Sequence, residues 1–127
     1  MHRSALGALS IDVPSRDVAA STAFWRAALG RTSRQGTQLP EFQVLVGRFG
    51  PMEGLVQDVG ETPPRVHLDV HTDDIGAEVV RLTGLGATEV ARHGGWVVLE
   101  DPAGMAFCVC GVDGDDPVLD GAKTWDG

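Results

Sequence analysis

The pattern of apolar and polar residues predicts a strand and then a helix near the start of the chain. Over about residues 6–13, Leu9, Ile11 and Val13 alternate with polar or small residues, which is typical of a strand with one buried face. Apolar residues then recur every three to four positions over about residues 18–29, the spacing of one helix face. We therefore expect a strand followed directly by an amphipathic helix.

This first helix has predictable ends and one apolar stripe. Asp17 is a residue type that caps helix N-termini, and Gly30 is the type that ends helices. Val18, Trp25 and Leu29 lie on one side of the helix, so we expect them to pack into the core.

The remainder of the first half predicts two strands, at about residues 42–46 and 55–59, with a turn at 47–51. Residues 61–64 then include two consecutive prolines, which favour a stiff, extended connection. We expect this segment to link the first half of the chain to the second.

The second half predicts the same order of elements. A strand over about residues 65–71 precedes a helix over about 74–85, for which Thr72 or Asp73 is the expected N-cap. The apolar stripe of this helix is Ile75, Val79 and Leu82. Three strands are then expected at about residues 88–92, 95–99 and 105–110, with a tight turn at 101–104.

The two halves form a degenerate internal repeat. The paired positions are Ile11 with Leu68, Val13 with Val70, Asp17 with Asp74, Ser10 with His67, and Gln57 with Cys108. Two copies are too few for a solenoid, so a pseudo-twofold pair of βαβββ modules is the simpler interpretation. This predicts an α+β domain in which a curved mixed sheet surrounds a cavity and the helices lie on the outer face. The expected modules are about 5–60 and 65–112, with a tail at 113–127.

Composition limits the possible partners. The chain has 127 residues, 43% of them hydrophobic, which fits one domain, and a net charge of -8 with scattered Lys and Arg. Binding to nucleic acid or an anionic membrane is therefore not expected. No apolar run reaches the roughly 20 residues that cross a bilayer, and the first residues lack a secretory signal, so a cytoplasmic location is expected.

Two features of the second half carry less information. Cys108 and Cys110 are two residues apart on a predicted strand, a poor geometry for a mutual disulfide, so reduced thiols are expected. The acidic segment 113–116 is interpreted as a solvated turn, because an EF-hand needs further ligands. The sequence does not identify a partner for Trp125.

Several short motifs together resemble a known family. They are Phe24-Trp25 with Ala28-Leu29-Gly30, Arg65 to Val70, Arg81-Leu82 with Leu85-Gly86-Ala87, and Trp96 to Leu99 with Asp101-Pro102, Gly104 and Phe107-Cys108. They resemble the glyoxalase-like domains of the vicinal oxygen chelate superfamily, which includes glyoxalases, bleomycin-resistance proteins and dioxygenases. The resemblance covers about residues 6–112 and implies the same fold.

The resemblance also implies four metal-ligand positions: Ser10, Gln57, His67 and Cys108. Family members usually carry His, Gln and Glu at such positions, and of these four only His67 is a strong ligand of the usual kind. Isomerisation and dioxygenation of the family type need a divalent ion held by at least three good donors. We therefore expect that the usual metal site is degenerate, with His67, Gln57 and Cys108 as its remaining candidate ligands.

Strand alternation allows a different metal site. Side chains two apart on a strand share a face, so His67, Asp69 and His71 project together, as do Cys108 and Cys110. If the two strands are neighbours, zinc could bind His67 and Asp69 with the two thiols. The alternative is that the cysteines are small buried hydrophobes.

Two functions remain open. The first is a binding domain for a small, largely apolar or aromatic molecule, in a cavity lined by His67 and Cys108, with Ser10, Gln57 and Trp96 as further contacts. The second is a lyase, isomerase or dioxygenase that uses a divalent ion at His67, or no metal at all, with His67 or Asp69 as general base. The resemblance also implies a homodimer.

Overall fold

The computed structural model describes residues 1–36, 41–49 and 52–126. The chain folds as two units, one formed by Ala8–His67 and the other by Met1–Gly7 together with Leu68–Gly127. Strands β1 (His2–Val13) and β5 (Arg65–Thr72) each contribute residues to both units.

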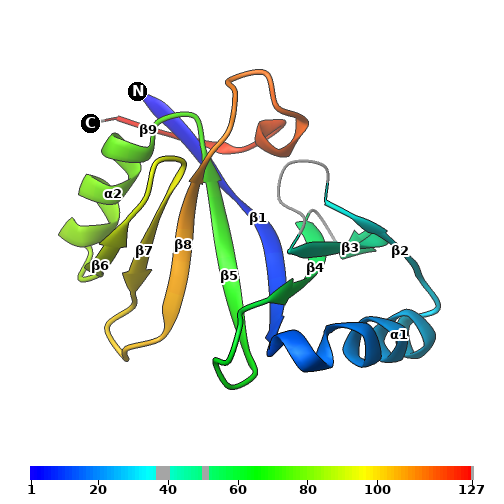
Figure 1. The fold of residues 1–127 in the computed structure, drawn as a ribbon. Helices are drawn as coiled ribbons and strands as arrows, with labels where there is room; N and C mark the ends of the chain where they lie inside the picture. Colours follow the sequence, from blue (N-terminus) through cyan, green and yellow to red (C-terminus); the bar gives the residue numbers. More distant parts are fainter. Residues whose placement is uncertain (37–40, 50–51, 127) are drawn as a thin grey trace. The chain divides into compact units, whose positions relative to one another are not determined.

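The unit Ala8–His67 contains the second part of β1 and one helix (Figure 1). Its further elements are a short 3-10 turn (Ser15–Asp17), α1 (Val18–Leu29), β2 (Thr32–Gln35), β3 (Phe42–Phe49) and β4 (Met52–Asp58). The strand order is β2-β3-β4-β1, and β1 runs parallel to β4 whereas the other neighbours are antiparallel.

Helix α1 begins and ends where the sequence predicts, but its buried stripe differs. Val18 and Trp25 pack on the buried core residues Val13, Leu45 and Val56. Leu29 is 41% exposed, because it lies at the last position of the helix, before Gly30 (φ 63°) reverses the chain. The prediction that Leu29 is buried is therefore wrong. Asp17 occupies the N-cap position, but its side chain makes no capping hydrogen bond.

The second unit repeats this arrangement around α2 (Figure 1). After β5 come α2 (Ile75–Gly84), β6 (Thr88–Arg92), β7 (Trp96–Glu100) and β8 (Ala106–Gly111), followed by a 3-10 turn (Pro117–Leu119) and β9 (Lys123–Trp125). The strand order is β5-β8-β7-β6 with β5 parallel to β8, and β9 pairs with residues His2–Ser4 of β1.

Helix α2 covers one face of these strands. Val79 is buried with Val97, Leu99 and Val109, and Ile75 and Leu82 pack against this cluster, as the sequence predicts. The N-cap is Asp74, whose side chain accepts a hydrogen bond from the Ala77 amide, and not Thr72 or Asp73. Asp74 takes this role because its backbone is extended while Ile75 begins the helix.

Glu78 is a fully buried charged residue on α2 that the helical pattern does not reveal. It accepts hydrogen bonds from Arg81 (Nε to Oε1, 2.8 Å) and pairs with His2 (3.1 Å). Burial alone raises the pKa of Glu78, but hydrogen bonds from Arg81, Ser4 and His2 outweigh it and hold the pKa below its ordinary value.

The tail docks on its own unit and is not only a solvated turn. Leu119 is buried, and the Trp125 Nε1 donates to Ser4 Oγ (2.9 Å). The Arg81 guanidinium lies 3.8 Å from the centroid of the Trp125 ring. Within segment 113–116, Asp116 caps the following turn through the Val118 amide (2.9 Å).

Both units are thus βαβββ with the same strand order, and the predicted α+β fold of mixed strands with two helices is confirmed. The register is also repeated, because Asp12 pairs with Gln57 in one unit and Asp69 pairs with Cys108 in the other. Strand β2 was not predicted. The predicted turn at 47–51 is wrong for residues 47–49, which continue β3, and residues 50–51 lie outside the described residues.

Candidate functional site

A buried polar cluster lies in the unit Ala8–His67, on the sheet face opposite α1. Because Ile11 and Val13 face the helix core, the alternating residues Ser10 and Asp12 face the other way. Neither Ser10 nor Asp12 has exposed surface, and His67 is 7% exposed. Three polar residues are therefore largely removed from solvent on this face.

The Asp12 carboxylate is the centre of this cluster. Its Oδ2 lies 2.6 Å from His67 Nδ1 and accepts a hydrogen bond from Arg65 Nε (3.2 Å), while its Oδ1 accepts from Ser10 Oγ (2.8 Å). A carboxylate only accepts, so this contact places the proton of a neutral imidazole on Nδ1 and the lone pair on Nε2. Asp12 thereby fixes both the orientation and the tautomer of His67.

Sequence reasoning missed Asp12. The alternating pattern of the strand predicts that Asp12 is an exposed polar residue, because its partners His67 and Arg65 are more than 50 positions away in the sequence. One signal was available, because Asp12 occupies the same position in the repeat as Asp69, a predicted site residue.

Apolar side chains lie beside this polar cluster. Ala8 of β1, Leu55 of β4 and Val44 of β3 form a buried apolar group, and Leu55 is the register partner of Ser10. Gln57 is half-buried and is the register partner of Asp12, which places it on the same face. The face thus combines an apolar group with a hydrogen-bonded imidazole.

The four metal-ligand positions implied by the family fit an ion poorly. The Ser10 hydroxyl is fully buried and donates to Asp12, and Gln57 offers only a neutral amide oxygen. Only His67 and Cys108 are donor types that hold transition metals well. The residues present therefore do not fit a metal site of the family type.

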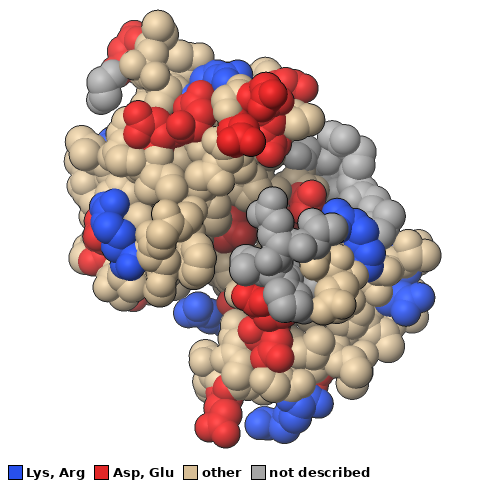
Figure 2. Space-filling model, turned by 45° about the horizontal axis from the view of Figure 1, so that its top comes forward, with Lys and Arg blue, Asp and Glu red and all other residues tan. Residues whose placement is uncertain are grey.

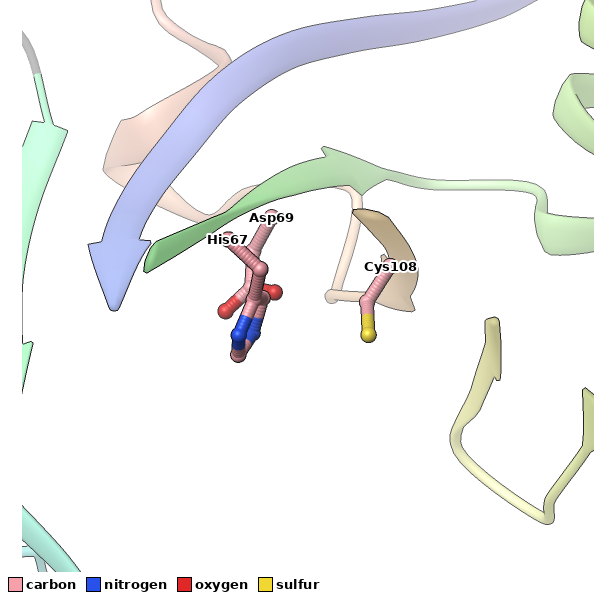
Figure 3. A group of neighbouring side chains, drawn as sticks. All are labelled: His67, Asp69 and Cys108. Atoms are coloured by element: carbon pink, nitrogen blue, oxygen red, sulfur yellow. The ribbon is translucent and has the colours of Figure 1, made fainter. Parts of the chain in front are cut away.

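A second group of polar side chains lies on β5 and β8, on the face opposite α2. Figure 3 shows Asp69 leaving β5, with its register partner Cys108 leaving the neighbouring strand β8. The next pair along these strands is His71 and Cys110, which are direct register partners. The ligand atoms of Asp69, His71 and Cys110 all lie within 4.8 Å of one another.

The two cysteines are free and half-buried. Burial raises the pKa of the Cys110 thiol well above its ordinary value, and the charges of Asp69 and Cys108 raise it further. Cys110 is therefore a protonated thiol near neutral pH.

Trp96, the other predicted ligand contact, is the register partner of Cys110. This residue is 38% exposed and its ring stacks on His93, with 4.5 Å between the ring centroids. The structure thus places Asp69, Cys108 and Trp96 on one face of one unit, and Ser10 and Gln57 on one face of the other.

Comparison with known proteins gives the family. Residues 8–110 match the family described as glyoxalase-like domain. The chain belongs to this family. No curated protein matches this glyoxalase-like domain.

Solved structures share the fold of this glyoxalase-like domain at low identity. A hypothetical protein, BH1468, from Bacillus halodurans is 12% identical to this chain. The match covers 98% of this chain and 99% of BH1468, with a TM-score of 0.63. Methylmalonyl-CoA epimerase from Streptomyces coelicolor, in complex with 2-nitronate-propionyl-CoA, is 12% identical over 89% and 96% of the two chains, with a TM-score of 0.59. The Mycobacterium tuberculosis epimerase is 15% identical over 84% and 86%, with a TM-score of 0.56.

The surface of the glyoxalase-like domain agrees with its acidic composition. On the face that Figure 2 draws, Lys and Arg side chains are dispersed and do not form one basic patch. Within the part of the chain that the structure describes, no helix is long and apolar enough to cross a membrane.

Proposed function

We propose that this domain binds a small, largely apolar or aromatic molecule, and that it does so without a metal ion at the four family positions. The hydrogen bond between Asp12 and His67 carries the proposal, because it holds an imidazole in one orientation on the sheet face that also carries a buried apolar group. A few oriented polar groups within apolar surroundings are typical of small-molecule sites.

Each residue has a distinct role in this proposal. Ala8, Val44 and Leu55 form the buried apolar group of this face, and His67 is the proposed polar anchor. Asp12 and Ser10 are positioning residues, because they act on a ligand only through His67. Gln57, Cys108 and Trp96 remain predicted ligand contacts, and the homodimer and cytoplasmic location also remain predictions.

Ligand binding to metal-free protein tests the proposal. Protein treated with EDTA is titrated with 8-anilinonaphthalene-1-sulfonate, an aromatic probe, and then with a panel of small aromatic and aliphatic compounds that displace it. We expect saturable binding that His67→Ala weakens about tenfold, equivalent to about 1.4 kcal/mol. Asp115→Ala is the control, because its side chain is exposed and lies in the tail of the other unit. Binding that is absent, or equal in His67→Ala and wild type, contradicts the proposal.

A second candidate function is proton transfer to or from a bound carbon acid. It is favoured by the 2.6 Å contact between Asp12 and His67 Nδ1, because a carboxylate that orients an imidazole leaves its Nε2 able to act as a base. Proteins of similar fold include enzymes named as epimerases, but their likeness to this chain is one of fold alone.

Solvent deuterium uptake distinguishes this second function. Small ketones and thioesters with acidic C–H bonds are incubated with the protein in heavy water and followed by proton NMR. Uptake that depends on His67, and whose pH profile shifts in Asp12→Asn, supports catalysis. Equal uptake with wild type and His67→Ala contradicts catalysis by His67, and ligand binding is then the proposed function that stands.

A further inference from the structure

The strongest unassigned cluster lies on β5 and β8, in the unit that contains α2. Asp69 and His71 are two residues apart on β5, and His71 pairs with Cys110 on β8. Strand alternation directs all three side chains away from α2, because Val70 and Val109 on the same strands belong to the helix core. Three different donor types therefore meet on one sheet face.

Distances among these donors suit one small cation. Their ligand atoms all lie within 4.8 Å of one another. Around a zinc ion bound at about 2.0 to 2.3 Å, tetrahedral ligand atoms are about 3.3 to 3.8 Å apart. The separations would therefore have to shorten by at most about 1.0 to 1.5 Å for one ion to reach all three donors.

The backbone makes room for the imidazole of this cluster. Gly7 of β1 lies against the His71 ring, and a Cβ at Gly7 would overlap three atoms of that ring. Glycine at this position therefore lets the ring occupy the space next to β1, where it stays within reach of Asp69 and Cys110.

The donor types indicate which ion binds. Thiolate and imidazole are ligands that zinc and similar transition metals prefer, whereas magnesium and calcium prefer sites made of oxygen alone. We propose that Asp69, His71 and Cys110 bind a zinc-like divalent ion, with water or another ligand at the fourth position. This site is one step along the strands from the family positions His67 and Cys108, and it does not depend on the proposed small-molecule function.

Cobalt substitution tests this site directly. Protein stripped with EDTA and desalted, with no organic ligand present, is titrated with Co²⁺ and read by its thiolate-to-cobalt absorption, then by competition with Zn²⁺. We expect one equivalent to bind, and Cys110→Ser to remove the thiolate band. His71→Ala is expected to weaken binding by at least about tenfold, with His71→Gln as a second variant if the first unfolds.

The matched control separates this site from the family positions. Cys108→Ser and His67→Ala should keep the cobalt band, because neither residue belongs to the proposed ligand set. Circular dichroism and the thermal midpoint of each variant establish that it is folded. Absence of a thiolate band in the wild type overturns the proposal. Loss of the band in folded Cys108→Ser, or its retention in folded Cys110→Ser, overturns it as well.

Discussion

The two βαβββ units place different chemistry on equivalent faces. In Ala8–His67, the imidazole of His67 is held by a hydrogen bond to a buried carboxylate, and that carboxylate has further donors in Ser10 and Arg65. In the other unit, the His71 ring packs on Gly7, and its polar neighbours are a carboxylate and a thiol. A shared backbone register thus fixes where side chains meet but not which chemical groups they carry.

Removal of Asp12 should have the largest effect on this comparison. Asp12→Ala leaves His67 and Arg65 without their carboxylate partner, and loss of one member of a buried pair costs about 3 kcal/mol. Urea unfolding measures this loss. Asp17→Ala is the matched control, expected to stay within about 0.5 kcal/mol. Equal stability of the two variants would show that the Asp12 network contributes little.

A methyl group at Gly7 tests how His71 is held. Gly7→Ala should destabilise the domain by about 1 to 3 kcal/mol, because the new methyl group overlaps the imidazole. Gly94→Ala is the control in the same unit, since no atom lies within 4 Å of a Cβ there. Thermal unfolding gives the stability, and NMR of the His71 ring reports its displacement. An unmoved ring would contradict the packing described above.

Acid should weaken the unit that contains α2 through Glu78. Its pKa is lower in the folded protein than its ordinary value of 4.5, so its stabilisation is present above that pH and is lost as the pH falls below it. One such group contributes a slope of at most about 1.4 kcal/mol per pH unit. Urea unfolding between neutral and acidic pH measures the slope, which Glu78→Gln should reduce.

The smallest expected effect concerns thiol reactivity and leaves stability unchanged. In Cys108→Ser protein, Cys110 should react with a disulfide reagent at least about tenfold more slowly than after unfolding, because burial and Asp69 keep it protonated. Addition of Co²⁺ should slow the reaction further if Cys110 is a ligand. The prediction is contradicted if Cys110 of the folded protein reacts with the reagent as fast as it does after unfolding.

Much of the fold could be predicted, because hydrophobic periodicity is strong in both halves and the repeat supports each assignment with the other. The ends of α1 and of β6 agree with the prediction. Strand β2 was missed because Thr32–Gln35 is polar throughout and its pairing with β3 leaves no apolar alternation. Leu29 was placed in the core because periodicity does not show whether the last residue of a helix still has core residues to pack against.

The buried charges, including Asp12 of the candidate site, were less predictable than the fold. Asp12 and Glu78 are buried charges, and a charge is stable inside a protein only with partners that the fold brings from distant positions. Arg65 and His67 reach Asp12 from 53 and 55 positions away, and His2 reaches Glu78 from 76 positions away. Residues two apart on one strand, such as Asp69 and His71, share a face by local geometry and could be predicted.

The pairing of β9 with β1 makes a circular permutation of this chain feasible. His2 and Trp125 are direct register partners, so the two ends of this chain lie on neighbouring strands. A short glycine-rich linker could join them, and the exposed segment 61–64 offers a place to open new termini. Such a circular permutant would keep every strand pairing described above while reversing the order in which the two βαβββ repeats leave the ribosome.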